Sequence, residues 1–216
     1  IEDYPAKIAE MLLNGLVDVA LVPVVIIPQM KEYYIITDFC IASNGPVASV
    51  GLFSDVPVEK IKKVYLDYQS RTSVMLAKIL LKEYWKQEVK FINATSEEFQ
   101  KEIVGSTAGV IIGDRALEQR LKSKYIYDLG EAWKHHTGLP FVFAAWISNK
   151  RLPADFIIQF NEANAFGVQH LNEVIAENPC TIIDLNKYYT ECISYKLDEG
   201  KKVGLKLFLE KLTQSN

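Results

Sequence analysis

The stretch Lys63-Val-Tyr-Leu-Asp-Tyr-Gln-Ser-Arg-Thr-Ser73 runs directly into Val74-Met-Leu-Ala-Lys-Ile-Leu-Leu-Lys-Glu-Tyr-Trp85. Its beginning predicts a short buried strand from Val64 to Asp67, followed by a polar turn and a long helix over residues 73–85. A buried strand that leads through a turn into a helix is half of a β-α-β unit. The stretch therefore indicates an α/β protein.

Three hydroxyl side chains, Ser70, Thr72 and Ser73, stand where this helix begins. The first N–H groups of a helix lack backbone partners and carry partial positive charge, so this end attracts anions. The hydroxyls therefore either cap the helix or hold a ligand carboxylate. Capping is the simpler explanation for the motif by itself, whereas its position after a buried strand favours binding. Arg71 either adds positive charge to such a site or faces solvent.

Strand and helix patterns alternate along the rest of the chain. Asp3 can cap a first helix that ends at Gly15. The apolar run over residues 18–24 lacks the alternation of a strand with one wet face, which predicts a parallel strand covered on both faces. Further strands are expected at 33–37, 39–43, 47–53, 89–93, 108–113, 125–129 and 141–148, and helices at 96–104, 114–121, 153–177, 186–197 and 198–212.

This order predicts an α/β fold with two lobes. The central alternation predicts β-α-β units on a parallel sheet, and the helical tail is expected to return to the sheet formed by the first fifty residues. Lobe I would comprise residues 1–52 and 141–216, and lobe II residues 53–140, with the strands at 47–53 and 141–148 crossing between them. A cleft between two such lobes is a common ligand site.

Two other strand ends carry polar residues that are expected to face this cleft. Ser43 and Asn44 follow one strand just before a Gly-Pro break, where a plain turn is the alternative explanation. Asp114 follows another strand, where it can instead cap the next helix.

Composition limits the class of partner. The chain has 216 residues, of which 49% are hydrophobic and 24% charged, and a formal net charge of −3. No basic face is evident, which argues against a nucleic-acid or membrane-surface partner. Neither a signal-peptide pattern nor an apolar run long enough to span a bilayer occurs, so a cytoplasmic protein is expected. Since the chain opens at Ile1 on a helical pattern, we expect further residues upstream.

Common chemical motifs are missing from the sequence. Cys40, Cys180 and Cys192 show no C-x-x-C spacing and are expected to be buried, inert thiols. His135 and His136 are adjacent and lack a third ligand at metal spacing, so no metal site is expected. Neither a glycine-rich nucleotide motif nor G-x-S-x-G occurs. The residues alone predict a two-lobed binder of a small anion, with no signal for an oligomeric state.

Several segments resemble, in order, the chorismate dehydratases, which open the futalosine route to menaquinone. They are Asp18-Val-Ala-Leu-Val-Pro-Val24, Cys40-Ile-Ala-Ser-Asn-Gly-Pro-Val-Ala-Ser-Val50, Leu66-Asp67 with Ser70-Arg-Thr-Ser73, and Asp128-Leu-Gly-Glu-Ala-Trp133 with Thr137-Gly-Leu-Pro-Phe-Val-Phe-Ala-Ala-Trp146. The helical tail, with residues 193–200 and 204–208, is similar to the end of the family as well.

The resemblance implies the fold of type II periplasmic binding proteins and the loss of water from chorismate to give an enolpyruvyl-oxy benzoate. Chorismate is a small dicarboxylate, and its ring becomes aromatic, so no metal or organic cofactor is expected. The enzyme would clamp the carboxylates, position the ring and transfer protons. By this resemblance Ser70, Thr72 and Ser73 hold one carboxylate, with Ser43 and Asn44 on the opposite wall. Arg71, Asp114 and Phe141 complete the expected substrate-binding set.

One departure from the family concerns its beginning. The family starts with a strand and a Ser-Tyr-Leu-Asn type loop whose Asn is thought important for catalysis, and this segment has no counterpart here. The general base is therefore not identified. Two alternatives stay open: a non-catalytic binding domain for small anions on the same fold, and the sister family that makes dihydroxynaphthoate. The Ser-Arg-Thr-Ser form favours the dehydratase.

Overall fold

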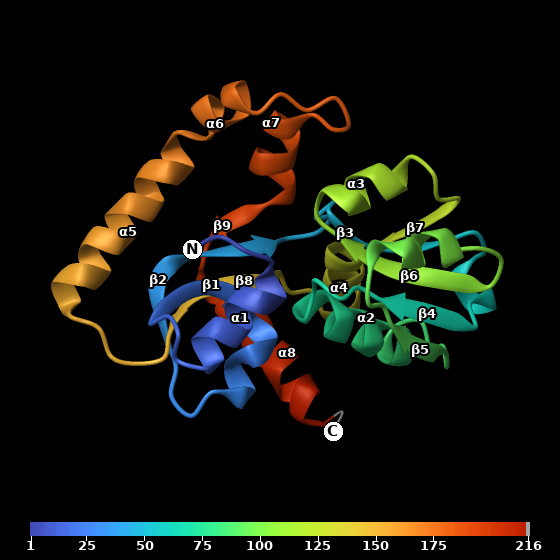
Figure 1. Ribbon diagram of the computed structural model, residues 1–216, viewed down its shortest axis with the longest axis horizontal. Coiled ribbons are helices and arrows are strands. Elements are labelled where there is room, and N and C mark those ends of the chain that lie inside the picture. The colour runs from blue at the N-terminus through green and yellow to red at the C-terminus, as the bar shows by residue number, and fades with distance from the viewer. Residues whose placement is uncertain (215–216) are drawn as a thin grey trace.

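Two β-sheets, side by side, organise the computed structural model, which describes residues 1–214 (Figure 1). The first sheet has the strand order β1-β8-β2-β9 and the second the order β5-β4-β6-β3-β7. The first comprises β1 (Val19–Pro23), β2 (Tyr34–Ser43), β8 (Phe141–Ser148) and β9 (Ser194–Lys196). The second comprises β3 (Val50–Ser54), β4 (Lys63–Leu66), β5 (Lys90–Asn93), β6 (Thr107–Ile112) and β7 (Tyr125–Asp128).

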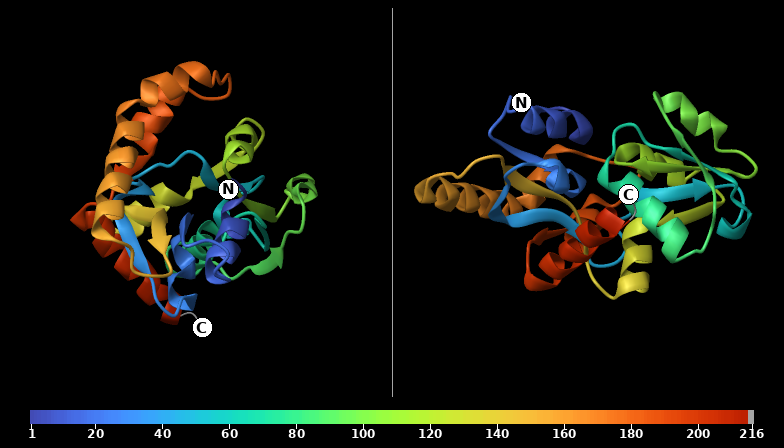
Figure 2. Two further views of the ribbon diagram at one scale, coloured as in Figure 1. Left: turned by 60° about the vertical axis from the view of Figure 1, so that its left-hand side comes forward. Right: turned by 90° about the horizontal axis from the view of Figure 1, so that it is seen from below.

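Helices surround both sheets. The part of the chain on the first sheet, called lobe I below, carries α1 (Pro5–Leu13), the 3-10 helix η1 (Val24–Gln29), α5 (Ala154–Gln169), α6 (Leu171–Glu177), α7 (Leu185–Lys187), the π-helix η4 (Tyr188–Cys192) and α8 (Glu199–Gln214). The part on the second sheet, lobe II, carries η2 (Val58–Lys60), α2 (Thr72–Glu83), η3 (Glu97–Glu102), α3 (Asp114–Arg120) and α4 (Leu129–Thr137). Helices α5 and α6 form an arc along the outer side of lobe I (Figure 2).

The strand directions differ in part from the sequence-based prediction. The prediction of a parallel strand at residues 18–24 is wrong, because β1 pairs antiparallel with β8. Helix α1 packs against β1, so the apolar run reflects cover by other elements and says nothing about direction. In the second sheet β4 is parallel to β5 and β6, as predicted, but β3 is antiparallel to β6 and β7. The sheet is therefore mixed.

The chain passes between the sheets in short linkers. The prediction that strands 47–53 and 141–148 cross between lobes is wrong, since β3 pairs only within the second sheet and β8 only within the first. We propose that the lobes meet at residues 44–49 and 138–140. The first linker is held by the buried carboxylate of Asp128, which accepts the N–H groups of Val47 and Ala48 at 3.0 and 2.8 Å. Ala48 has a positive φ of 62°.

The tail is less regular than its apolar pattern predicts. The expected helix over 153–177 is divided at His170, and the one over 186–197 is replaced by η4 and β9. The segment predicted as a helix capped by Ser96 forms η3, without a side-chain cap. Asp3 likewise does not cap α1, because its carboxylate accepts the N–H of Tyr4, the residue before the helix, and not that of a helical residue.

An aromatic cluster joins the two lobes. The ring of Trp133 on α4 meets that of Phe141 on β8 at a centroid distance of 5.2 Å, and Phe141 meets Phe208 on α8 at 5.0 Å. All three side chains are fully buried.

The cysteines differ in exposure. Burial raises the pKa of the Cys40 thiol to about 12, whereas Cys180 is exposed, so the prediction of three buried cysteines is wrong.

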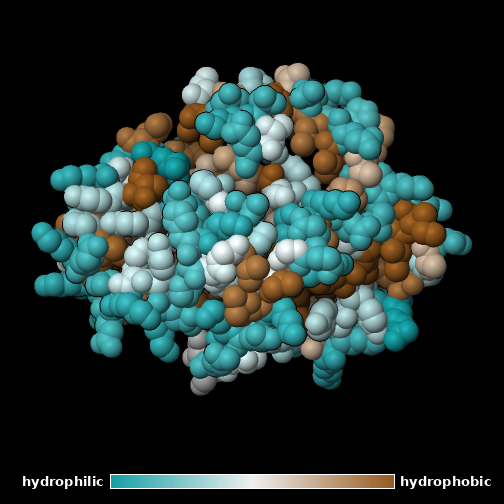
Figure 3. Space-filling model, turned by 180° about the vertical axis from the view of Figure 1, so that it is seen from behind, coloured by the Kyte–Doolittle hydropathy of each residue, from teal (hydrophilic) through white to brown (hydrophobic). Residues whose placement is uncertain are grey.

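The surface mixes hydrophilic residues with smaller hydrophobic areas on the face drawn in Figure 3. Among residues 1–214, no helix combines the length and apolar character that crossing a bilayer requires.

Candidate functional site

A cleft of about 250 Å³ lies between the two lobes. Among the described residues its lining includes no charged side chain, and its only ionisable group is the phenol of Tyr188. Its polar side chains are all hydroxyls, surrounded by apolar ones. The lining residues are Pro5, Leu21, Pro23, Ile41, Val47, Ser49, Val50, Ser70, Thr72, Ser73, Ile112, Gly113, Phe143, Ala144, Tyr188 and Ile193.

A buried ion pair supports the turn between β4 and α2, which carries three of those hydroxyls. The carboxylate of Asp67 is fully buried and lies 2.8 Å from Nη2 of Arg115. It also accepts the backbone N–H groups of Gln69 at 3.0 Å and Ile112 at 3.2 Å. Arg115 donates in addition to Oε1 of Gln69 at 2.7 Å. Charge-assisted hydrogen bonds of this kind are strong, so the turn is fixed to the carboxyl ends of β4 and β6.

The hydroxyl groups of Ser70, Thr72 and Ser73 are free to donate hydrogen bonds to a ligand. Ser70 Oγ accepts the N–H of Ser73 at 3.3 Å, which is a capping interaction. Thr72 Oγ1 accepts the N–H of Val25, across the lobes, at 3.4 Å. In both cases the oxygen serves as acceptor, and within residues 1–214 no protein acceptor takes the hydroxyl hydrogen of any of the three. Capping by Ser70 therefore leaves its O–H free to donate.

This end of α2 can bind an anion. Helix α2 has twelve residues, so the partial positive charge at its first turn is developed in full. The three O–H groups and that charge act together on a negative oxygen. Because Thr72 and Ser73 are almost completely buried, water competes weakly for the same donors.

Another wall of the cleft contains a second pair of hydroxyls. Tyr188, the first residue of η4, donates from its phenol to Oγ of Ser49 at 2.8 Å. Ser49 lies at the end of the linker and donates weakly to the carbonyl of Val47 at 3.5 Å. Burial raises the pKa of Tyr188, and the charge of Asp114 acts in the same direction, so the phenol stays protonated at neutral pH.

The other predicted site residues lie outside the lining of the cleft. Ser43 is completely buried, and its Oγ has no partner among the described residues. Asn44 is exposed in the linker, and Asp114 is exposed at the first position of α3, next to Gly113. Phe141 belongs to the aromatic cluster. The wall expected from Ser43 and Asn44 is formed instead by Val47, Ser49 and Tyr188.

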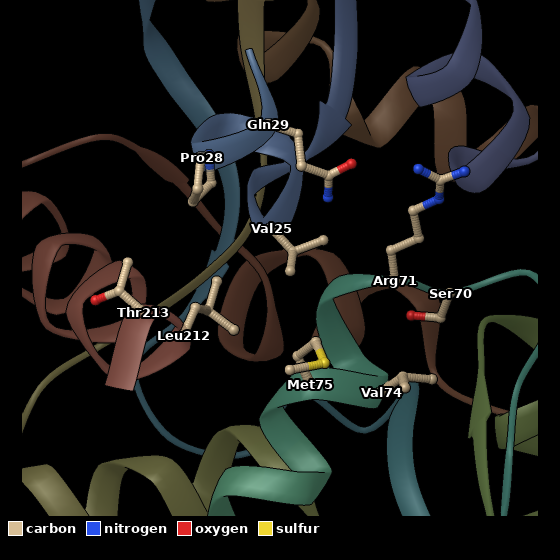
Figure 4. Close-up of a pocket in the computed structure, with 9 residues that line it drawn as sticks. All are labelled: Val25, Pro28, Gln29, Ser70, Arg71, Val74, Met75, Leu212 and Thr213. Carbon is tan, nitrogen blue, oxygen red and sulfur yellow. The ribbon is translucent and has the colours of Figure 1, made fainter. Parts of the chain in front are cut away.

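Arg71 borders a separate hollow of about 370 Å³ (Figure 4). Its side chain extends toward α1, where Nη2 lies 2.5 Å from the Glu10 carboxylate. The hollow also contains apolar side chains from η1, α2 and α8, and it shares Ser70 with the cleft. Arg71 therefore forms a contact between the lobes and does not line the cleft.

Sequence reasoning missed Ser49, Tyr188 and Arg115. Tyr188 lay in a segment predicted as helix, and the pair Tyr188-Tyr189 gives no sign of which ring turns inward. Arg115 follows Asp114, and nothing in the sequence links it to Asp67 forty-eight positions earlier. Residues 1–214 contain no group of three His, Cys, Asp or Glu side chains placed to hold a metal ion.

Comparison with known proteins gives the family of this chain. Residues 1–214 match the family model described as menaquinone biosynthesis. The chain belongs to that family. It is 30% identical over 233 residues to a chorismate dehydratase of Thermus thermophilus, covering 96% of this chain and 84% of the relative. It is 31% identical over 211 residues to a chorismate dehydratase of Campylobacter jejuni, covering 95% of this chain and 80% of the relative.

Solved structures show the fold of this member of the menaquinone biosynthesis family. A protein of Archaeoglobus fulgidus superposes with a TM-score of 0.70 at 15% identity, covering 100% of this chain and 84% of that one. The periplasmic aliphatic sulphonate binding protein of Escherichia coli superposes with a TM-score of 0.60 at 14% identity, covering 99% and 76%. The chain thus has the two-lobed fold of periplasmic binding proteins. At these identities the likeness carries no function.

Proposed function

We propose that this protein is a lyase that removes water from chorismate to give an enolpyruvyl-oxy benzoate, as a step of menaquinone biosynthesis. The family and the two chorismate dehydratases among its relatives support the reaction. The structural observation that carries the proposal is the set of three free hydroxyl donors at the start of α2, in a cleft whose described lining has no charged side chain. Such a site suits a ligand that brings its own negative charge.

One carboxylate of chorismate binds to Ser70, Thr72 and Ser73 at the positive end of α2. Apolar side chains such as Leu21, Ile41 and Phe143 contact the ring and exclude water. In this setting each hydrogen bond to the carboxylate is stronger than it would be in water. The site therefore fixes one end of the substrate and lets the ring lie flat against apolar groups.

The reaction is an elimination. A ring C–H bond and the neighbouring C–O bond break, water leaves, and the ring becomes aromatic. Holding the substrate in one orientation supplies much of the help that such a step needs. Burial raises the pKa of the Tyr188 phenol, which favours it as a hydrogen-bond donor in this cleft, and the general base is not identified. We further propose that the reaction belongs to the futalosine route and takes place in the cytoplasm.

Incubation of the purified protein with chorismate tests the proposal. The expected product is an aromatic enolpyruvyl ether, detected by liquid chromatography with mass spectrometry as the loss of one water from the substrate. The double variant Thr72→Ala/Ser73→Ala is the matched control and should form much less of it. Binding of chorismate without turnover would instead support a non-catalytic binding domain. Turnover of the cyclic futalosine derivative that the sister synthase uses, with none of chorismate, would support the sister synthase.

A further inference from the structure

We propose that Tyr188 is a substrate-contacting residue of this cleft: its phenol leaves Ser49 when substrate binds and donates to a substrate oxygen. This inference rests on the proposed function, because it concerns the same cleft. It adds a second point of attachment, supplied by the tail of lobe I, to the hydroxyls at the start of α2 in lobe II.

The position of Tyr188 supports this role. Its side chain lines the cleft together with Ser70, Thr72 and Ser73, although it comes from a segment more than a hundred residues later. Its phenol donates a hydrogen bond of 2.8 Å to Ser49 Oγ, which belongs to another residue of the cleft lining. A donor that already points at the lining can reach a ligand oxygen after a small rotation of its ring or of its O–H group.

The chemistry of the pair makes the exchange favourable. Ser49 is a neutral acceptor and already uses its own hydrogen toward the Val47 carbonyl. A carboxylate oxygen is a better acceptor, because hydrogen bonds to charged groups are roughly twice as strong as neutral ones. A dicarboxylate has one such group for α2 and another for Tyr188. With no cation among the described lining residues, neutral hydroxyl donors must serve both groups.

The local backbone is also unusual at this point. Tyr188 begins η4, in which the chain forms a π-helix over Tyr188–Cys192. Such segments are rare and often occur at functional sites, where they change the direction of a side chain. Here Tyr188 and its neighbour Tyr189, whose rings lie 5.1 Å apart, are placed differently, since only Tyr188 lines the cleft.

Three variants separate this role from a structural one. In Tyr188→Phe the ring remains and the donor is lost, so KM for chorismate should rise by about 10- to 100-fold, the range for a hydrogen bond to a charged group. In Ser49→Ala the resting partner is lost and the donor is freed, so KM should stay level or fall by up to about threefold. Tyr189→Phe is the matched control and should behave like the wild type.

The outcomes are distinct. If Tyr188→Phe and Ser49→Ala raise KM alike, the pair only braces the cleft and the proposal is overturned. An unchanged KM in Tyr188→Phe overturns it as well. Equilibrium binding of chorismate, measured by titration calorimetry on variants with native circular dichroism, excludes a folding defect as the cause. A wild-type protein that binds chorismate but does not convert it would overturn the proposed function alone, since the affinities of the three variants would still test the contact.

Discussion

Lobe II lines the cleft with the hydroxyls of Ser70, Thr72 and Ser73, whereas lobe I lines it mainly with apolar side chains from β1, β2 and β8. The two sides also differ in what lies behind them. Behind the hydroxyls is the buried pair of Asp67 and Arg115, and behind the apolar strands is hydrocarbon core. We infer that the hydroxyls of lobe II suit a charged group and the strands of lobe I an apolar one, with Tyr188 on the tail of lobe I as the one polar exception among the described lining residues of that lobe. A polar site needs fixed orientations, which a buried ion pair provides, whereas an apolar wall needs only dense packing.

Replacing Asp67 by Ala should produce the largest effect on the lobe II side. The change leaves Arg115 largely buried without its partner, which costs about 3–5 kcal/mol in the free energy of unfolding. The turn that carries Ser70 also loses the hydrogen bond from its Gln69 N–H and the one that ties it to the Ile112 N–H of β6, so KM for chorismate should rise in the protein that remains folded. Urea denaturation and steady-state kinetics measure the two effects. Glu98→Ala, which alters an exposed ion pair on the same lobe, is the control and should change the free energy by less than about 1 kcal/mol.

Replacing Phe141 by Ala tests the lobe I side. The side chain is fully buried between Trp133 and Phe208, so the cavity left behind should cost about 3–5 kcal/mol in the free energy of unfolding. If lobe I acts through packing alone at this position, KM of the folded fraction should stay within about twofold. Urea denaturation and kinetics below the transition measure both. A rise in KM comparable to that in Asp67→Ala would return Phe141 to the substrate-binding set expected from the sequence.

The double variant Thr72→Ala/Ser73→Ala tests whether the hydroxyls of lobe II bind an anion or only support the start of α2. Loss of the donors should weaken chorismate binding by about 1–3 kcal/mol, measured by titration calorimetry. Ser96→Ala, at a position that precedes η3 without a side-chain cap, is the matched control and should bind normally. Normal affinity in the double variant, with only a lower melting temperature, would give these two hydroxyls a structural role, such as the bond from the Val25 N–H to Thr72 Oγ1.

The contact between the lobes at Glu83 should show a small dependence on pH. Burial alone would raise the pKa of Glu83, but hydrogen bonds from Lys211 on α8 and His136 on α4 outweigh it and hold the pKa below its usual value. A lowered pKa means that the contact stabilises the folded state above about pH 4.5 and that this contribution is lost as pH falls through the folded-state pKa.

Because Glu83 is partly exposed, the contribution should be below about 1 kcal/mol. Unfolding free energies at pH 6 and pH 3.5 measure it, and the wild type should lose more stability between the two values than Glu83→Gln does. Equal losses of stability in the two proteins would show that the Glu83 contact does not contribute to the free energy of unfolding.

Much of the fold could be predicted from local pattern. The strand before Ser70 was found to within one residue and the helix after it to within two, because hydrophobic periodicity and a cluster of hydroxyls are short-range signals. The direction of β1 could not be found this way. It depends on β8, more than a hundred residues later, and an apolar strand covered by α1 looks the same in either direction.

The candidate site shows the same limit. Ser70, Thr72 and Ser73 were identified because a helix begins there, and a helix start is a local event. Tyr188 and Ser49 come together only after the tail folds back to the linker, and Arg115 meets Asp67 only when β6 pairs with β4. Such long-range partners leave no spacing in a single sequence that could be read.

The order of the strands in the first sheet has a consequence for synthesis on the ribosome. β1 and β2 do not pair with each other; each pairs with β8, which lies between them in the sheet. All strands of the second sheet lie within residues 50–128, so that sheet can assemble while β8 is still being made. Strands β1 and β2 precede the second sheet in the sequence, but among the described residues their first partner is β8, at residues 141–148. We therefore expect the second sheet to form before β1 and β2 join theirs.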